Sequence, residues 1–387
     1  MSITRAYAIT AQAVAAEAER TGGDFEDIDV SKIIAVDDLE LRAVGHRDVK
    51  LRILAASGEH NIQHAALADT VNIAEGRGGK IYPGNSALGE VIEVGSEVTK
   101  FKVGDIVVTH CNGEPDENGF PLRIWAYDQP ESIGWYSKEA VVGDWQLVKA
   151  PLDCGLSLWE MAALPLRAPT AYHLWRRAIG IYRVKVPYER RAKINAMSFG
   201  GGVGELFVML AKSEGHNAFF CAGNAERRSA LEKQGIVGID QKAFNRFATK
   251  EDIKAFNKEC KKLTGGEGMH LVCDMLRGPV FDAGLAVAAR CGVNVSAGWQ
   301  LSQKVSYNST IQSVKQVTID HTHYETPAGC EAATELYGSV FKPTIHSEIY
   351  KFEDLPRCMQ ETHENTQNGI PIIRIADELP ASVAKLV

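Results

Sequence analysis

The spacing of apolar residues changes along the chain. In the first part, apolar and polar residues alternate, or form short apolar runs that end at glycine, which is typical of β-strands. The strands expected there cover residues 49–54, 87–95 and 106–108. Residues 111–121 are rich in Gly, Pro, Asn and acidic side chains and indicate an exposed loop. The chain is therefore expected to be β-rich up to about residue 165.

From about residue 193, short apolar runs alternate with segments of helical spacing. The pattern predicts strands at 193–199, 218–222, 271–274 and 293–295, and helices at 206–212 and 225–234. Strands that alternate with helices indicate βαβ units and a parallel sheet. Beyond about residue 325, the pattern predicts a helix near 329–337 and strands at 345–350 and 370–375.

Composition and charge narrow the class of protein. The 387 residues are 45% hydrophobic and 24% charged, as in a globular chain of two or three domains. The net charge of −7 argues against a nucleic-acid partner, which requires a basic surface. No apolar run approaches the roughly 20 residues needed to cross a bilayer. The first twenty residues carry Glu17 and Glu19 and lack the apolar core of a secretory signal, so a cytoplasmic protein without a membrane partner is expected.

The cysteines give no local metal or redox motif. The eight cysteines are scattered, and no two form a C-x-x-C pair. This spacing argues against a zinc ribbon and against a thioredoxin-type motif. It agrees with buried thiols in a reducing compartment.

A glycine-rich turn lies between a predicted strand and a predicted helix. Ser198, Gly201 and Gly204 match S-x-x-G-x-x-G, whereas G-x-G-x-x-G fails because residue 205 is glutamate. Such a turn lets the backbone and the helix N-terminus approach a pyrophosphate. The alternative is a tight corner without a ligand, but the βαβ pattern that follows favours dinucleotide binding.

The residues at the end of the second predicted strand indicate whether NADH or NADPH is the cofactor. Residues 220–224 (FCAGN) contain no acid that could bind the ribose hydroxyls of NADH. Arg227 and Arg228 follow at once, and a guanidinium can bind a phosphate through two hydrogen bonds. NADPH is therefore the expected cofactor, although both arginines could also be ordinary solvated helix residues. The candidate cofactor-binding residues are Ser198, Gly201, Gly202, Val203, Gly204, Asn224, Arg227 and Arg228.

The order of these segments resembles the medium-chain dehydrogenase/reductase superfamily. Residues 94–108 resemble its GroES-like domain, and Thr170-Ala171-Tyr172 resembles its interdomain segment, which implies that Thr170 belongs to the cofactor site. The implied fold is α/β, with a GroES-like, β-rich catalytic domain and a Rossmann domain with a doubly wound parallel sheet. The implied boundaries are 1–166 for the first part of the catalytic domain, 167–322 for the NADP-binding domain and 323–387 for the return.

The zinc ligands of the alcohol dehydrogenases are missing from this sequence. The matching places hold Ser57-Gly58-Glu59 and Gly84-Asn85-Ser86, without a thiolate or an imidazole. The four-cysteine structural lobe is also missing. The resemblance therefore points to the zinc-free branches, and no metal is expected.

Three further segments resemble the crotonyl-CoA carboxylase/reductase family. Residues 123–130 (RIWAYDQP) resemble its R-I-W-G-Y-E-T-P segment, and His110-Cys111-Asn112 resembles its H-C-N run. Residues 240–244 (DQKAF) resemble its N-R-K-D-F segment. Members of this family add hydride from NADPH to the β-carbon of an unsaturated acyl-CoA, and the resulting enolate takes up CO2 or a proton.

The same resemblance implies the catalytic residues. The family's CO2 pocket is matched here by Asn61, the pair Tyr127-Asp128, and His321. Asn61 and His321 would donate hydrogen bonds, and Asp128 would hold an ordered water. The alternative roles are structural: a turn residue for Asn61, a loop cap for Asp128 and a core imidazole for His321.

Departures from the family pattern favour protonation over carboxylation. Asp320 stands directly before the pocket histidine, where it would order water or relay a proton, and His60 and Asp128 replace an aromatic residue and a glutamate. The favoured function is an NADPH-dependent 2-enoyl-CoA reductase, with a carboxylating reductase as the alternative. A zinc-free quinone or acyl-carrier-protein enoyl reductase and an inactive NADPH-binding protein also remain open. The resemblance further implies an acyl-CoA substrate in the cleft between the domains, CO2 as a second candidate substrate, and a homodimer or homotetramer.

Overall fold

The computed structural model describes residues 2–24, 27–61, 78–298, 300–302 and 304–387. The chain divides into two compact units, described separately below. The first unit contains Met1–Leu166, Glu325–Ser339 and Ile345–Val387. The second unit contains Arg167–Tyr324 and Val340–Thr344.

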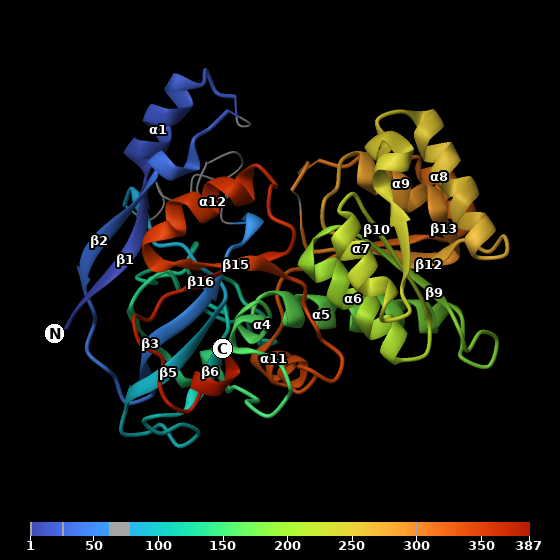
Figure 1. Ribbon diagram of the computed structural model, residues 1–387. Coiled ribbons are helices and arrows are strands. Elements are labelled where there is room, and N and C mark those ends of the chain that lie inside the picture. Colours follow the sequence, from blue (N-terminus) through green and yellow to red (C-terminus); the bar gives the residue numbers. More distant parts are fainter. Residues whose placement is uncertain (1, 25–26, 62–77, 299, 303) are drawn as a thin grey trace. The chain divides into compact units, whose positions relative to one another are not determined.

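The first unit begins with a small antiparallel sheet in the order β2-β1-β4. Strands β1 and β2 lie side by side in Figure 1. Its strands are β1 (Ile3–Thr10), β2 (Ile34–Glu40) and β4 (Lys80–Ile81). Helix α1 (Ala11–Arg20) follows β1 directly, and the Thr10 side chain caps it by accepting from the Ala13 N–H. The sequence patterns above did not predict this part of the fold.

The larger sheet of the first unit joins both ends of the chain. Its strand order is β15-β16-β3-β5-β6-β8, and β7 pairs with β3. The strands are β3 (Asp48–Ser57), β5 (Ala87–Val94), β6 (Ile106–Thr109), β7 (Glu139–Gly143), β8 (Leu147–Lys149), β15 (Ile345–Lys351) and β16 (Ile370–Arg374). Strands β16 and β3 pair in antiparallel register, with Ile372 opposite Ser57. The helices of this unit include α4 (Leu158–Ala162), α11 (Pro327–Thr334) and α12 (Leu355–His363).

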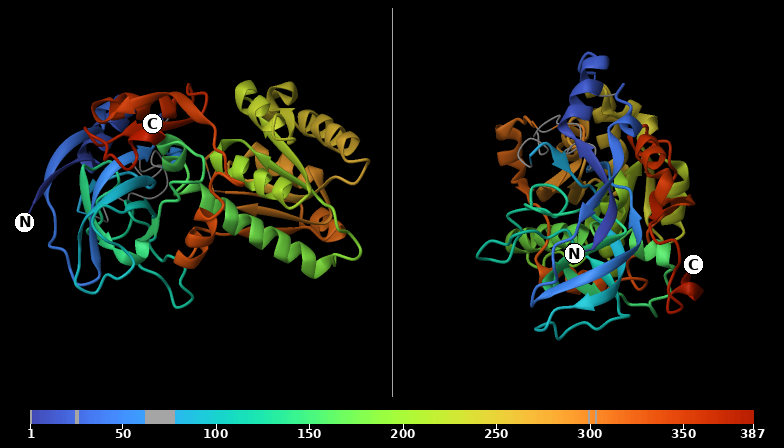
Figure 2. Two further views of the ribbon diagram at one scale, coloured as in Figure 1. Left: turned by 60° about the horizontal axis from the view of Figure 1, so that its bottom comes forward. Right: turned by 90° about the vertical axis from the view of Figure 1, so that its left-hand side faces the viewer.

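The second unit contains a parallel sheet in the order β11-β10-β9-β12-β13-β14. The strands are β9 (Asn195–Phe199), β10 (Asn217–Ala222), β11 (Val237–Asp240), β12 (Met269–Asp274), β13 (Ala288–Ser296) and β14 (Thr318–His321). The helices are α5 (Arg167–Lys185), α6 (Gly201–Ser213), α7 (Ala225–Glu232), α8 (Lys250–Leu263), α9 (Pro279–Val287) and α10 (Ser309–Lys315). Helices α5 and α8 lie on opposite faces of this sheet (Figure 2, left). The predicted α/β class, with a GroES-like part and a parallel-sheet domain, is confirmed.

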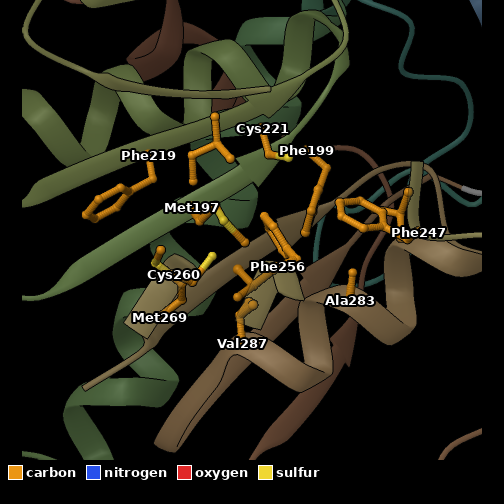
Figure 3. Packing of buried hydrophobic residues seen from close by; sticks show 13 residues of the cluster. Met197, Phe199, Phe219, Cys221, Phe247, Phe256, Cys260, Met269, Ala283 and Val287 are labelled. Carbon is orange, nitrogen blue, oxygen red and sulfur yellow. The ribbon is translucent and has the colours of Figure 1, made fainter. Parts of the chain in front are cut away.

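The core of the second unit fixes the end of β9, from which the glycine-rich turn begins. Successive side chains of a strand point to opposite faces of the sheet. Met197 and Phe199 of β9 therefore face α8 and α9 (Figure 3). The ring centroid of Phe199 lies 5.9 Å from that of Phe256 in α8 and 5.7 Å from that of Phe247, which precedes α8. Ser198 points to the other face, toward α6. The end of β9, and with it the glycine turn, is thereby held from both sides.

The return of the chain differs from the expected one. A return at residue 323 was predicted, but residues 340–344 belong to the second unit, although the segments on either side of them belong to the first. Helix α11 also begins two residues before the predicted start, because Thr326 caps it and Pro327 occupies its first turn. In the described part of the chain, no helix is long and apolar enough to cross a membrane.

Candidate active-site and cofactor residues

The turn between β9 and α6 has room for a phosphate. Gly200 and Gly201 have φ angles of 36° and 72°, in the left-handed region that favours glycine. A Cβ on Gly201 would meet no atom within 4 Å, so the space beside this backbone is open. A Cβ on Gly204 would instead lie 2.9 Å from the carbonyl oxygen of Phe199. Glycine is therefore needed at 204 for close packing and at 201 for an open approach to the N-terminus of α6.

These observations fit a dinucleotide. Gly201, Gly202, Val203 and Gly204 form the first turn of α6, where backbone N–H groups and the helix dipole favour an anion. Ser198 does not face this space, because its hydroxyl donates to the Gly204 carbonyl oxygen at 2.6 Å. Its place in the motif is therefore structural: it ties the strand to the helix.

Two other residues predicted to bind the cofactor, Asn224 and Thr170, lie in helices of the second unit or at their ends. Asn224 is the N-cap of α7, and its side chain accepts from the Arg227 N–H at 3.0 Å. Thr170 is buried in α5. Both belong to the second unit, as the prediction requires.

Arg227 is turned away from the position predicted for it. Its Nε lies 2.8 Å from Oε1 of Glu205, a fully buried residue of α6. Burial raises the pKa of Glu205, and the neighbouring positive charge of Arg227 opposes this rise. The prediction that Arg227 faces a ribose phosphate is not supported, because a buried carboxylate draws its guanidinium inward.

The end of β10 presents a lysine that the sequence analysis did not single out. Arg228 donates to the Ala222 carbonyl oxygen and lies 3.1 Å from Asp240, so its charge is already paired. A Cβ on Gly223 would lie 3.4 Å from Cε of Lys242, which places the lysine side chain over the end of this strand. Dinucleotide-binding domains distinguish the two forms of the cofactor at this strand end. The signal was present in the DQKAF segment, but the sequence did not show where its lysine would point.

A second group lies at the carboxyl end of β12, next to the glycine turn. Asp274, opposite Phe199 in the sheet, accepts from the backbone N–H groups of Leu276 at 2.8 Å and Arg277 at 2.9 Å. Burial raises the pKa of Asp274. Arg277 has a left-handed φ of 61°, and its Nη2 lies 3.2 Å from Nδ1 of His321. The sequence analysis named His321 but missed the turn that contacts it.

Asp320 belongs to an ion pair. It precedes His321 in β14, so the two side chains leave the strand on opposite faces. Its carboxylate accepts from Arg177 Nε at 2.6 Å and from Arg177 Nη2 at 2.7 Å. The structure thus pairs Asp320 with α5, and a role of this carboxylate in proton relay stays a prediction.

The first unit holds a buried cluster of hydroxyl and carboxyl groups. Ser57 Oγ donates to Glu59 Oε1 at 2.8 Å, and the Tyr136 hydroxyl donates to the Ser57 carbonyl oxygen at 2.9 Å. Tyr127 is enclosed beside them. Burial raises its pKa well above the usual value, and the nearby Glu59, Tyr136 and Cys111 raise it further. The phenol therefore keeps its proton at neutral pH.

Asn61 and an aromatic pair belong to the same unit. The Asn61 Oδ1 atom is buried, and no donor among the described residues reaches it. A buried amide oxygen of this kind is costly unless a ligand or water pairs with it.

Trp125 and Trp135 stack with ring centroids 5.4 Å apart, and the Trp125 carbonyl oxygen accepts from Asn85 Nδ2 at 2.9 Å.

Asp128 closes a turn in the first unit, and its place in a CO2 pocket stays a prediction. Its side chain is exposed, and Oδ1 accepts from the Ile124 N–H at 2.6 Å. This contact closes the turn in which Ala126 has a φ of 73°. The residue therefore shapes the segment that carries Tyr127, instead of contributing a carboxylate to the buried cluster.

The places of the missing zinc ligands are occupied by other contacts. Ser57 donates to Glu59, Asn85 to Trp125, and Ser86 Oγ accepts from the Leu166 N–H at 2.9 Å. No group of three or more His, Cys, Asp or Glu side chains within the described residues could hold a metal ion. The zinc-free assignment stays a prediction.

Comparison with known proteins identifies the family. A model of the alcohol dehydrogenase GroES-like domain matches residues 43–152, and a model described as zinc-binding dehydrogenase matches residues 202–338. Cinnamyl alcohol dehydrogenase 5 of Arabidopsis thaliana is 32% identical over 257 residues, which cover 61% of this chain and 68% of that protein. The chain belongs to the medium-chain dehydrogenase/reductase superfamily. The resemblance to this superfamily predicted from the sequence is confirmed.

Within the superfamily, similarity over most of the chain points to reductases of enoyl thioesters. A crotonyl-CoA carboxylase/reductase of Cereibacter sphaeroides is 23% identical over 85% of this chain and 80% of its own length. The solved structure of a 2-octenoyl-CoA carboxylase reductase with NADP and 2-octenoyl-CoA matches with a TM-score of 0.82 at 19% identity. That match covers 100% of this chain and 91% of the other. At this identity the structural match shows a common fold.

Proposed function

We propose that this protein reduces the α,β double bond of a 2-enoyl-CoA thioester with NADPH and protonates the product. The similarity to the carboxylase/reductases described above supports the substrate class. The observation that carries the proposal is the buried cluster of Ser57, Glu59, Tyr127 and Tyr136, which keeps a phenolic proton in a unit of the GroES-like type.

The cofactor site belongs to the second unit. NADPH, when bound, supplies the hydride that adds to the β-carbon of the substrate. The first turn of α6 binds the pyrophosphate, with Gly201 keeping the approach open and Gly204 holding the helix close to β9. Lys242 supplies the positive charge for the 2′-phosphate, a role that the sequence suggested for Arg227 and Arg228.

Replacing Lys242 with alanine should raise the Kd for NADPH about 10-fold and leave the Kd for NADH unchanged. The variant loses one charge-assisted contact, and a tenfold change corresponds to about 1.4 kcal/mol. Fluorescence titration with each cofactor measures both constants. Lys233→Ala removes an exposed lysine of the same unit and serves as the control. An equal loss for NADPH and NADH would contradict the assignment of Lys242.

Protonation of the enolate is assigned to Tyr127. After hydride addition, the electron pair of the enolate forms a C–H bond at the α-carbon, and the O–H bond of Tyr127 breaks. The resulting phenolate regains a proton from solvent. General acid catalysis of this kind contributes about 10²–10⁴-fold to a rate.

Carboxylation is the second candidate function, and Asn61 favours it. Its buried Oδ1 has no hydrogen-bond donor among the described residues. The Asn61 amide is therefore a polar group of the first unit that the protonation step does not use. The exposed position of Asp128 argues against its predicted place at the CO2 site. Protonation is therefore the preferred outcome.

The direct test is NADPH oxidation with crotonyl-CoA and acryloyl-CoA, with and without bicarbonate and carbonic anhydrase. A product heavier by two hydrogens supports the proposal, and a product that also carries CO2 selects the second candidate. Oxidation with quinones or carrier-protein thioesters alone would select another zinc-free reductase. Cofactor binding without any turnover would identify an inactive NADPH-binding protein.

We also propose a homodimer formed through the second unit. Strand β14 ends the order of the sheet, so one of its edges has no partner strand among the described residues. Apolar side chains are exposed on helix α10, which precedes β14 in the chain, with Ile311 51% and Val314 67% exposed. An open strand edge and exposed apolar groups on the preceding helix both favour pairing with a second copy.

Replacing Val314 with glutamate should shift the protein from dimer to monomer. The change places a charge in the proposed apolar interface, where it has no partner. Light scattering coupled to gel filtration reports the mass of each form. Val184→Glu, a change at another exposed valine of the same unit, should leave the mass unchanged. A monomeric wild-type protein would rule out this interface.

A further inference from the structure

His321 occupies a position where a ligand can reach it. It is the last residue of β14 and lies opposite Ser296 of β13, at the carboxyl end of the parallel sheet. Ligands of open α/β sheets bind at this end of the strands. Part of the side chain is open to solvent and part of it is covered.

One ring nitrogen of His321 is already committed. Arg277 Nη2 lies 3.2 Å from Nδ1 of His321. A guanidinium has only donors, so in this contact Nδ1 accepts the hydrogen bond. A neutral imidazole that accepts at Nδ1 carries its proton on Nε2.

The charges around His321 favour the neutral ring. Partial burial lowers its pKa most, and the positive charge of Arg277 lowers it further, whereas Asp320 acts in the opposite direction. Asp320 is on the other face of the strand and is paired with Arg177. Ser296, the neighbour on β13, is uncharged. The ring is therefore neutral at pH 7.

The position of Arg277 is built into the turn after β12. Asp274 accepts from the Leu276 and Arg277 N–H groups at 2.8 and 2.9 Å and is itself fully buried. These two bonds hold Arg277 in its left-handed conformation, with φ 61°. The contact between the arginine and the histidine therefore originates in a rigid turn and not in two independent surface side chains.

We propose that Arg277 is a positioning residue that holds His321 in the neutral, Nε2-protonated form, so that His321 presents a fixed N–H donor to a ligand oxygen. The class of acceptor is a carbonyl-type oxygen on which negative charge develops. Given the proposed function, that oxygen is the thioester carbonyl, and it is only this identity that rests on the proposed function. A neutral ring that donates through Nε2 stabilises the developing charge without supplying the proton of the reaction.

The experiment is nitrogen-15 NMR of histidine-labelled protein, without substrate, across pH 5 to 8. The resonances of His321 are identified by their loss in His321→Gln. The wild-type ring should be neutral at pH 7, with its proton on Nε2. In Arg277→Gln the ring should titrate at a higher pH than in the wild type, because the positive charge is gone, and the Nδ1-protonated form should appear. Arg277→Lys keeps the positive charge and an N–H donor, and its spectrum should resemble the wild-type spectrum more closely than that of Arg277→Gln.

Three results would overturn the inference. The first is a wild-type ring that is charged or Nδ1-protonated at pH 7. The second is an Arg277→Gln spectrum identical to that of the wild type. The third is a spectrum of Arg176→Ala that changes in the way expected for Arg277→Gln. The last variant removes an exposed arginine that contacts the Tyr172 ring and not His321. Because no substrate is present, these results are independent of the enoyl-CoA assay. A failed NADPH assay would overturn the proposed function and leave the tautomer assignment intact.

Discussion

Replacing Gly201 with valine should abolish NADPH binding and leave the protein folded. The open space beside Gly201 would be filled by the new side chain, and the backbone N–H groups of α6 would no longer reach a phosphate. We expect the Kd for NADPH to rise about 100-fold or more, which corresponds to about 2.7 kcal/mol. Titration of intrinsic fluorescence measures this change without any assumption about the substrate.

The control for this variant must carry the same backbone strain. Gly265 also belongs to the second unit, has a φ of 61° and has no atom within 4 Å of a hypothetical Cβ. Gly265→Val should therefore lose about 1–2 kcal/mol of stability, as Gly201→Val does, because both place a side chain at a left-handed residue. If Gly265→Val weakened NADPH binding equally, the effect at Gly201 would come from strain and not from a blocked phosphate site.

Replacing Tyr127 with phenylalanine should lower kcat for crotonyl-CoA reduction about 100-fold without changing the Kd for NADPH. The variant keeps the buried ring and removes the proton that the enolate needs. Steady-state kinetics and cofactor titration separate the two effects. With bicarbonate present, the longer-lived enolate should also give a larger fraction of carboxylated product, which mass spectrometry detects.

Tyr337→Phe is the matched control. Tyr337 is a buried tyrosine of the same unit, and burial also raises its pKa. Removing this hydroxyl should leave kcat near the wild-type value, since Tyr337 is not part of the Tyr127 cluster. An unchanged kcat in Tyr127→Phe would remove this residue from the proton-transfer step.

The parallel sheet was predictable because its strands carry an unusually clear pattern. Strand β9 and strand β12 are buried along their full length, and glycines or polar residues bound them. Helix α8 was missed, although its apolar residues Phe256 and Cys260 have helical spacing, because charged residues dominate the segment around them. The start of the chain was missed for a different reason. Strands β1 and β2 are recognisable only once they are paired, since their stability depends on contacts that are distant in the sequence.

Site residues whose role depends on backbone conformation could be predicted from the sequence. Those whose role depends on the direction of the side chain were harder to predict. Gly201 and Gly204 follow from the turn that any such strand and helix require. The direction of Arg227 depends on Glu205, a buried acid on another helix, and no local pattern reveals that contact. Asp320 and His321 are adjacent in the sequence, yet the strand sends them to opposite faces. For Arg227 and Asp320, the sequence did not reveal which residue the side chain contacts.

The pairing of β16 with β3 determines when the first unit can be completed. During synthesis β5 and β7 follow β3 soon after, but β16 lies far behind them in the chain, at Ile370–Arg374. At about 5–20 residues per second, β3 waits on the order of tens of seconds for this neighbour. The second unit is translated almost entirely within that interval. Because β7 covers only Asp48–Arg52 of that edge, the Ala55–Ser57 part of β3 stays unpaired until β16 has been synthesised.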